Sequence, residues 1–490
     1  MRYTQELKHR YYTILAYVGF IFILNAFVLL LPLTALLWIP GEIGLSAGFL
    51  IPCALSAVAG LLFWKVFRPR AYTTLSVQEG GVIVLISWLG IFAFSTIPFI
   101  IISRLTFTQA VFEVVSGWTT TGLSVIDVTV TPKCILLFRS IIQLFGGAGF
   151  AIIMLAWISG PVGPGHSIAE GKSEQLAPHV KESAKLVMMI YTGYAIAGSI
   201  AYILAGMSTF DAINHAFAAI STGGFSTKPD SIGAWNSVSV ESVSIVLMIL
   251  GNLNFLTAYI LLRGKLRLLL RNGEIHVMAL LLPLGMAIIF FEVSSLLYEP
   301  LGKAVRVAVF ETVSSLTTTG FSTVGYKEWN ALGFIVLISL MLIGGGTCST
   351  AGGIKQFRIH LLAKALWWEL KRFFLPRTAV METYIWQGEN KEFITDRRIR
   401  EIAVFIFLYC ATFVIGSAIV AYYGYSLRDS LFEFASALGT VGLSVGITSP
   451  DAPVLVLWAE IVGMFLGRFE FFVIIISAVK LFKDILDIAR

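Results

Sequence analysis

The sequence predicts an all-α polytopic membrane protein in which two peripheral N-terminal spans precede four pseudo-symmetric repeats. Two observations indicate this fold class. Hydrophobic residues make up 57% of the 490 residues and charged residues only 13%, whereas a soluble domain carries about 25% charged residues. A short polar strip that contains glycine recurs four times between long apolar stretches. We therefore expect a chain that lies mostly in lipid and repeats one unit four times.

Ten apolar spans follow from the length of helix, about 20 residues, that crosses a hydrocarbon core of about 30 Å. The spans lie near 12–37, 44–65, 80–103, 133–159, 183–206, 238–262, 276–298, 331–365, 400–424 and 452–485. The first stretch is too long for the apolar core of a signal peptide, so we expect it to be retained. Most of the 35 Lys and Arg residues fall on one side of these alternating spans. The positive-inside rule therefore places both termini in the cytoplasm and the four strips on the outer side.

The four strips read TTTGLS, STGGFS, TTTGFS and GTVGLS, at 119–124, 221–226, 317–322 and 439–444. A segment of about a dozen residues precedes each strip, which is too short to cross a bilayer but fits a half-helix. Irregular backbone at membrane depth is tolerated only where it is buried or lines water. One copy would be interpreted as an ordinary loop. Four copies in register favour span–pore-helix–filter–span repeats around one pore.

The composition of the strips suits a cation. Backbone carbonyl oxygens can replace the water around a cation without adding net charge. Glycine can adopt φ > 0 and so turn successive carbonyls toward one axis. Each half-helix would also direct its partially negative C-terminal end at the centre of the pore.

The repeats divide the chain into seven segments. These are an N-terminal transmembrane hairpin (1–70), pore repeat 1 (71–160), a cytoplasmic linker (161–182), pore repeat 2 (183–271), pore repeat 3 with a broken second span (272–372), a second cytoplasmic linker (373–398) and pore repeat 4 (399–490).

Three polar features lie within spans. The run GGGTCSTAGG at 344–353 interrupts the eighth span, either as a simple kink or as a functional loop; it is no Walker A motif, because no strand precedes it. Arg468 lies deep in the tenth span, where an arginine needs water or a partner. It is either a structural ion pair with Glu460 or Glu470, or a fixed positive charge under the filter. Arg139 lies near the outer end of its span, and we expect it to brace a filter strand.

Other chemistry has little support in the sequence. The four cysteines are far apart and form no CxxC pair, and the six histidines form no HExxH motif. No nucleophile elbow or nucleotide loop occurs. We expect neither an enzyme, nor a nucleic-acid-binding protein, nor an organic cofactor in this chain.

The repeated strips resemble those of the Trk/Ktr/HKT superfamily of potassium transporters, and the chain is most similar to the bacterial Trk-type potassium uptake membrane subunit. The resemblance covers nearly the whole chain and implies one filter glycine per repeat. A serine at the first of these positions is associated with sodium preference, so Gly122 indicates potassium. The implied ion-binding residues, which would hold K⁺, are Thr120, Thr121, Gly122, Thr222, Gly223, Gly224, Thr318, Thr319, Gly320, Thr440, Val441 and Gly442. Gly439 and Val441 depart from the threonines of repeats one and three, so perfect fourfold symmetry is not expected.

The resemblance also implies a gate and partners. The gate would be an intramembrane loop at Gly344, Gly345, Gly346 and Thr347, together with Arg468. The implied assembly is a homodimer in the bacterial inner membrane, with a ring of cytosolic, nucleotide-binding regulatory subunits of the Rossmann type. The basic segments 263–271 and 367–377 could dock these subunits, or could serve only as the positive-inside signal.

The predicted function is channel-like potassium translocation across the inner membrane. The alternative is a symporter that couples potassium to H⁺ or Na⁺. Coupling needs a titratable group or a second ion site at mid-membrane, and only Glu292, Glu460 and Glu470 are candidates.

Overall fold

The computed structural model describes residues 2–37, 39–67, 76–148, 180–376, 383–387, 390–469 and 471–489. Most of the predicted linker 161–182, the end of the span 133–159 and Glu470 lie outside these residues.

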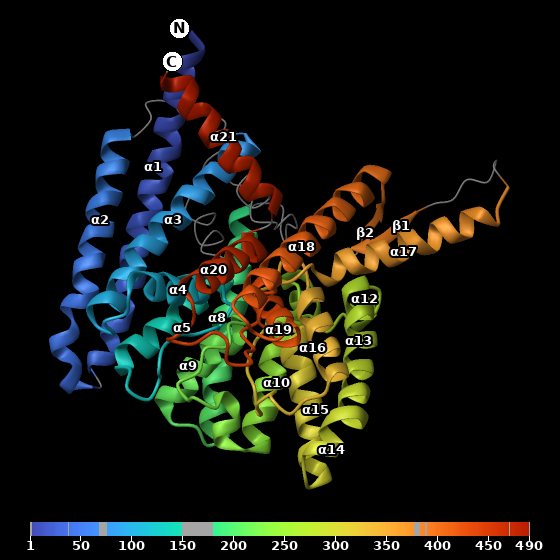
Figure 1. Ribbon diagram of the computed structural model, residues 1–490. Helices are drawn as coiled ribbons and strands as arrows, with labels where there is room; N and C mark the ends of the chain where they lie inside the picture. Colours follow the sequence, from blue (N-terminus) through green and yellow to red (C-terminus); the bar gives the residue numbers. More distant parts are fainter. Residues whose placement is uncertain are drawn as a thin grey trace.

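The N-terminal hairpin lies at one edge of the molecule (Figure 1). It consists of α1 (Arg2–Leu30) and α2 (Ala47–Phe67), joined by the 3₁₀ helices η1 (Leu31–Leu37) and η2 (Pro40–Leu45). The two helices cross at glycines: a Cβ added at Gly19 would lie 2.7 Å from the carbonyl oxygen of Gly60. Small residues allow such close approach in lipid, where helices associate mainly by packing.

Four repeats follow, and each consists of a long helix, a short pore helix and a second helix. Repeat one is α3 (Val77–Ile101), α4 (Phe107–Trp118) and α5 (Lys133–Ala148); repeat two is α8 (Val180–Leu204), α9 (Thr209–Ile220) and α10 (Val238–Asn252). Repeat three is α13 (Gly273–Ile289), α15 (Leu301–Leu316) and α16 (Ala331–Ile343); repeat four is α18 (Asp396–Tyr422), α19 (Leu427–Leu438) and α20 (Val454–Phe469). The other elements are η3 (Ser231–Trp235), α11 (Phe255–Leu262), α12 (Leu266–Leu269), η4 (Phe290–Ser294), α14 (Ser295–Leu297), α17 (Gln356–Phe373), β1 (Tyr384–Gln387), β2 (Asn390–Phe393) and α21 (Phe471–Ala489).

The pore helices begin at capping residues and end at the strips. Thr106, Ser208 and Ser426 each accept a hydrogen bond from the backbone three residues further on, which starts α4, α9 and α19. Each of these helices has 12 residues, as the half-helix prediction requires. Helix α15 is longer, with 16 residues, and starts after Pro300 without a side-chain cap.

The pore helices close a ring. Each one packs between the second helix of its own repeat and the second helix of the preceding repeat: α4 between α5 and α20, α9 between α10 and α5, α15 between α16 and α10, and α19 between α20 and α16. The fourth repeat therefore contacts the first, and the four strips meet around a common axis.

Two of the predicted spans are bent in the structure. The predicted span 238–262 is bent by 116° between α10 and α11, and the predicted span 452–485 by 103° between α20 and α21. The first bend has a local cause, because the Asn254 side chain caps α11 by accepting from Leu256 N at 2.9 Å. Six described helices are long and apolar enough to cross a membrane, or up to eight if each bent pair is one span.

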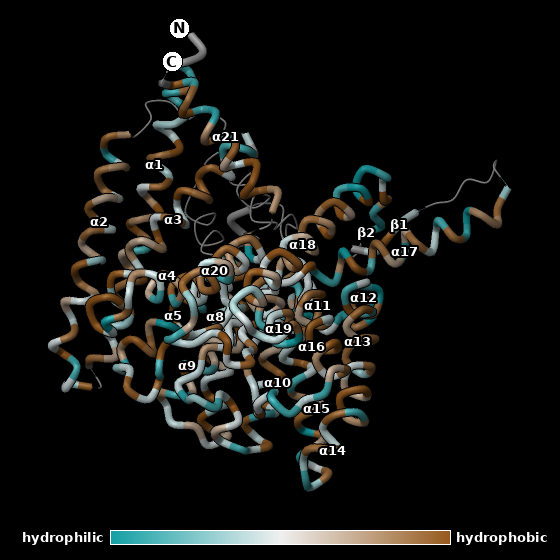
Figure 2. The backbone as a smooth tube through the Cα atoms, in the orientation of Figure 1, coloured by the Kyte–Doolittle hydropathy of each residue, from teal (hydrophilic) through white to brown (hydrophobic). Residues whose placement is uncertain are grey.

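The surface of the chain matches a lipid environment. Hydrophobic residues follow the long outer helices α1, α2 and α13, while hydrophilic residues gather at helix ends and along α17 (Figure 2). The start of α1 and the end of α21 lie together (Figure 1), and Tyr11 Oη donates to Asp484 at 2.8 Å. Helix α17 projects from the body, followed by the antiparallel hairpin β1–β2, which the sequence did not predict.

Candidate functional site

The four strips share one backbone conformation. Thr120, Thr222, Thr318 and Thr440 adopt φ between 50° and 56°, and Gly122, Gly224, Gly320 and Gly442 adopt φ between 71° and 105°. A threonine in the left-handed region costs about 1–2 kcal/mol, so the surrounding structure must hold it there. A backbone hydrogen bond to the pore helix does so in every repeat, from Thr121 N to Ser116 O, Gly223 N to Ala218 O, Thr319 N to Ser314 O and Val441 N to Ser436 O, at 2.8–3.0 Å.

The strips touch one another in cyclic order. A Cβ added at Gly122 would overlap the carbonyl oxygen of Gly223 in the next repeat. The same overlap occurs between Gly224 and Thr319 O, Gly320 and Val441 O, and Gly442 and Thr121 O. Four backbone carbonyls, one from each repeat, therefore form a closed ring. Each carbonyl packs against the glycine of the preceding repeat, where a side chain would not fit.

Serine hydroxyls support the strips from behind in three repeats. Ser116 accepts from Gly122 N at 3.1 Å and donates to Leu123 O at 2.6 Å. Ser314 donates to Phe321 O at 2.6 Å, and Ser436 accepts from Gly442 N at 2.9 Å. Repeat two has Ala218 at this position and cannot make the contact.

Gln143 replaces the missing serine in repeat two. It extends from α5 of repeat one, donates through Nε2 to the carbonyl of Gly223, and accepts through Oε1 from Phe225 N at 3.2 Å. Sequence reasoning did not identify this residue, although Ala218 at a position otherwise occupied by serine was a signal that the strip of repeat two needs other support.

A carboxylate braces the strip in three repeats. Glu113, Glu311 and Glu433 occupy equivalent positions in their pore helices, and all three are fully buried. Glu113 accepts from Ser124 Oγ at 2.7 Å, Glu311 from Thr323 N at 2.8 Å and Glu433 from Ser444 Oγ at 2.6 Å. His215 takes this place in repeat two, 3.0 Å from Ser226 Oγ.

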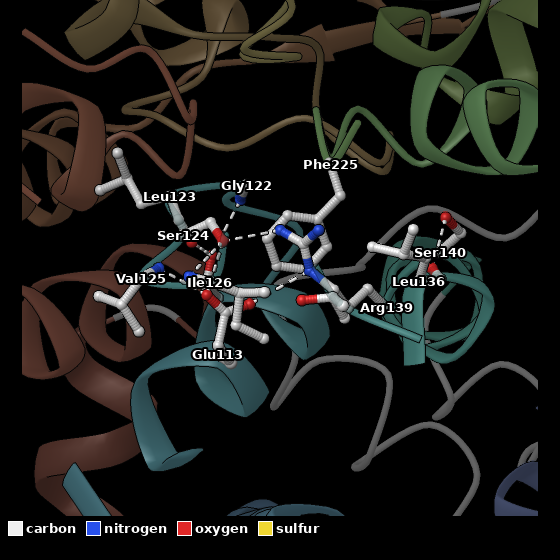
Figure 3. Close-up of polar contacts among 12 residues, drawn as sticks. Glu113, Gly122, Leu123, Ser124, Val125, Ile126, Leu136, Arg139, Ser140 and Phe225 are labelled. Carbon is white, nitrogen blue, oxygen red and sulfur yellow. Dashed lines mark hydrogen bonds and ion pairs between the residues drawn. The ribbon is translucent and has the colours of Figure 1, made fainter. Parts of the chain in front are cut away.

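Arg139 joins the strips of repeats one and two, as expected of a brace. Its guanidinium pairs with Glu113 at 3.2 Å, donates to Ser124 Oγ at 2.8 Å and reaches Ser226 O at 3.4 Å. It also lies 3.9 Å from the centre of the Phe225 ring. Figure 3 shows the guanidinium over this ring, with a dashed line from it to Ser124.

Replacing Arg139 with methionine is expected to destabilise the protein by about 3–5 kcal/mol, because it leaves the buried Glu113 carboxylate without its cation. Thermal unfolding of the purified protein in detergent should therefore begin at a lower temperature. The double variant E113Q/R139M removes both charges and should recover part of the loss. An R139M protein that unfolds at the wild-type temperature would contradict the brace.

A cavity of about 700 Å³ opens on one side of the strips, and we call it the vestibule. Its lining includes the four strip glycines Gly122, Gly224, Gly320 and Gly442, the charged residues Asp127, Arg139, Lys228 and Asp230, and Thr448. Hydrogen bonds from the Thr129 side chain and backbone hold the pKa of Asp127 below its ordinary value, so this carboxylate is charged at neutral pH.

The glycine-rich run lies on the opposite side of the strips. Helix α16 ends at Ile343, Gly344 adopts φ +68°, and α17 starts only at Gln356. Gly352 N donates to Thr318 Oγ1 at 2.8 Å, Thr222 Oγ1 donates to Thr350 Oγ1 at 3.2 Å, and a Cβ at Gly352 would overlap Thr440 Oγ1. The loop therefore touches the strip threonines of three repeats. The hydroxyls of Thr120 and Thr440 are buried without a hydrogen-bond partner in the described chain.

The tip of this loop is held by the break in repeat two and by α13. Thr347 donates through both its backbone N and its Oγ1 to Glu274 Oε1, each at 2.6 Å. Gly346 N donates to Asn252 O at 3.2 Å, and Asn254 Nδ2 donates to Thr347 Oγ1 at 3.4 Å. Sequence reasoning did not identify Glu274, because nothing local to it signals a loop 73 residues away.

Arg468 contacts the loop through backbone carbonyls. Its guanidinium donates to Thr350 O at 2.5 Å and to Gly146 O and Gly147 O at 2.8 and 3.3 Å. Glu460, one of its two predicted ion-pair partners, instead accepts from Thr448 Oγ1 at 3.0 Å. The ion pair with Glu460 is therefore wrong, and Glu470 lies outside the described residues. Arg468 places its charge beside the glycine loop.

No cluster of three or more His, Cys, Asp or Glu side chains that could hold a metal ion occurs in the described part of the chain. The oxygen atoms that lie close together at the strips are backbone carbonyls and threonine hydroxyls.

Comparisons with known proteins agree on one family. The profile of the family described as "TrkH: Cation transport protein" matches residues 49–484. The chain is 32% identical over 437 residues to the Trk system potassium uptake protein TrkG of Escherichia coli, covering 85% of this chain and 89% of that protein. It is 30% identical to an uncharacterized cation transporter of Methanocaldococcus jannaschii, covering 89% of each. The crystal structure of the potassium transporter TrkH from Vibrio parahaemolyticus is similar with a TM-score of 0.83 and 28% identity, over 95% of this chain and 98% of that one.

Proposed function

This chain belongs to the TrkH family of cation transport proteins, and on that premise we propose that it moves potassium ions across the inner (plasma) membrane through the ring formed by its four strips. The closed cyclic contact between each filter glycine and the next repeat's carbonyl is the observation that carries the proposal. Backbone carbonyls in such a ring would replace the hydration shell of K⁺. The proposed ion-binding residues are the twelve threonine, glycine and valine residues that the family resemblance implies.

Gln143 is expected to tune the selectivity of this ring. Its Nε2 donates a hydrogen bond to the carbonyl of Gly223, which is one of the four ring oxygens. Its Oε1 accepts a hydrogen bond from Phe225 N, two residues further along the strip. The variant Q143L leaves both groups without that support, so we expect a several-fold lower permeability ratio of potassium to sodium. The variant Q143E keeps the acceptor and loses the donor, which separates the two contributions. An unchanged ratio in a folded Q143L protein would contradict this role.

The glycine loop and Arg468 form the proposed gate. Support comes from the contacts of Gly352 and Thr350 with filter threonines and from the arginine's hydrogen bonds to the loop. A loop that blocks the conduction path must move for ions to pass. Asn254 at the break between α10 and α11, and Glu274 on α13, both bond to Thr347 and would guide that movement. A positive charge below the filter would add an electrostatic barrier to cations.

We propose channel-like flux rather than coupled transport. The experiment is potassium flux through the purified protein in liposomes, with and without an imposed pH or sodium gradient. Flux that follows the potassium electrochemical gradient alone supports the channel. Uphill potassium movement driven by a proton or sodium gradient would establish the symporter instead.

The remaining proposals concern topology and partners. The basic segments favour cytoplasmic termini and a vestibule that faces outward. We propose a homodimer, and a cytosolic nucleotide-binding regulatory ring that docks near α12 and α17, where Trp367, Phe373 and Phe374 are exposed. One relative is named a cation transporter and another a potassium uptake protein, in line with the expectation of a protein that is not an enzyme.

A further inference from the structure

The buried brace of repeat four differs from the others in its charge. Glu113 of repeat one is compensated by Arg139, and Glu311 of repeat three accepts from the hydroxyls of Tyr326 and Thr323. Glu433 of repeat four has no cation bonded to it in the described chain. Instead, a second buried carboxyl group, that of Glu460 on α20, lies on the other side of Thr448.

Thr448 joins the two carboxyl groups. Its backbone N donates to Glu433 Oε1 at 2.9 Å, and its Oγ1 donates to Glu460 Oε2 at 3.0 Å. Both glutamates are 0% exposed. Glu433 also accepts from Ser444 Oγ and Val445 N at 2.6 and 2.9 Å, so it is surrounded by donors that suit a carboxylate anion. Glu460 Oε1 has no hydrogen-bond partner among the described residues.

Among the described residues, no charged group near α20 is placed to neutralise Glu460. In the described chain, the charged residues on the helices packed against α20 are Glu113 on α4; Arg428, Asp429 and Glu433 on α19; Asp396, Arg397, Arg398, Arg400 and Glu401 on α18; and Lys480, Lys483, Asp484 and Asp487 on α21. None of them bonds to Glu460. Arg468 lies about two turns further along α20 and is directed to Thr350 and Gly146.

Two buried carboxyl groups that share one hydrogen-bonding residue, with no cation bonded to either among the described residues, do not both ionise, because each charge disfavours the other and burial disfavours both. The hydrogen-bond donors around each group indicate which one is neutral. Glu433 has the donors of an anion and Glu460 does not. Thr448 and Ser444 line the vestibule, so Thr448 connects Glu460 to the cavity above the strips.

We propose that Glu460 is a proton-binding site that communicates with the vestibule through Thr448 and makes flux through the filter depend on pH. At neutral pH it is a carboxylic acid. At alkaline pH its O–H bond breaks, the proton passes to water in the vestibule, and a second anion is left beside Glu433. Repulsion then loosens Thr448 and Val445, which hold the end of the repeat-four strip, and flux falls. The flux part of this inference rests on the proposed function; the protonation of Glu460 does not.

Infrared difference spectroscopy tests the protonation directly on the purified full chain. The wild-type minus E460Q spectrum at neutral pH should contain the C=O stretching band of a protonated carboxylic acid, and the band should disappear reversibly as the pH is raised. The substitution E6Q, at a side chain 66% exposed, is the matched control and should leave that band in place. If E460Q does not fold, E460D keeps an acid and should shift the band. Absence of the band at neutral pH, or its persistence in E460Q, would overturn the proposal.

Potassium flux in liposomes then tests the consequence. Wild-type flux should fall several-fold between neutral and alkaline pH on the vestibule side, whereas E460Q, which imitates the neutral acid, should keep its neutral-pH flux throughout. Equal pH profiles of the two proteins would contradict the proposed regulation. A wild-type protein that carries no potassium at any pH would refute the proposed function and leave the infrared result unaffected.

Discussion

Replacing Gly320 with alanine is expected to abolish potassium flux in a protein that still folds. The alanine Cβ would overlap the carbonyl oxygen of Val441 in the next repeat, at a residue whose φ of +80° already disfavours a side chain. The ring cannot widen at one corner without moving the strip of repeat four. We expect flux at least ten-fold below wild type, measured as potassium uptake into liposomes that contain equal amounts of protein.

Gly302 provides the matched control. It lies in α15, the pore helix that leads to Gly320, and a Cβ added there meets nothing within 4 Å. The variant G302A should therefore keep wild-type flux and permeability ratio. Wild-type flux in G320A, or an equal loss in both variants, would show that the glycine contact does not shape the conduction path.

Replacing Arg468 with alanine is expected to raise potassium flux several-fold. The change removes a positive charge beside the loop and, with it, the hydrogen bonds from the guanidinium to Thr350 and to Gly146 at the end of α5. Both effects favour a displaced loop. The measurement is flux at saturating potassium in liposomes, in the absence of any regulatory protein.

The variant R468K separates charge from geometry. Lysine keeps the positive charge but cannot donate from a planar fork to carbonyls on two elements at once. We expect its flux to lie between wild type and R468A. Unchanged or lower flux in a folded R468A protein would exclude both the barrier and the restraint on the loop.

The strips and their pore helices could be predicted because their signals are local. Four polar strips in an apolar chain stand out by composition, and about a dozen residues before each strip fix a half-helix by length. The capping residues Thr106, Ser208 and Ser426 are also visible in the sequence. The functional importance of the glycine break at 344–353 and of Arg468 could also be inferred, because polar groups within a membrane span are energetically costly.

The contacts between repeats could not be predicted, because they join residues far apart in the chain. Gln143 supports a strip 80 residues away. Glu460 accepts a hydrogen bond from Thr448, which also bonds to Glu433, and does not pair with Arg468. The bend after Asn252 could not be predicted, because the mean hydropathy of the segments on both sides is high enough for one continuous span. The hydrogen-bond partners of the strip backbones depend on how the four repeats pack into a ring. That packing involves all four repeats together and leaves no local signal in the sequence.

Reversal-potential measurement is the most direct test of the proposed potassium pathway. The purified protein is reconstituted in liposomes with potassium and sodium gradients in opposite directions, and the membrane potential at zero current is recorded. A potassium-selective ring of carbonyls predicts a potential close to the potassium equilibrium value, and a shift toward zero in Q143L. Equal permeability to the two ions in the wild-type protein would contradict the account.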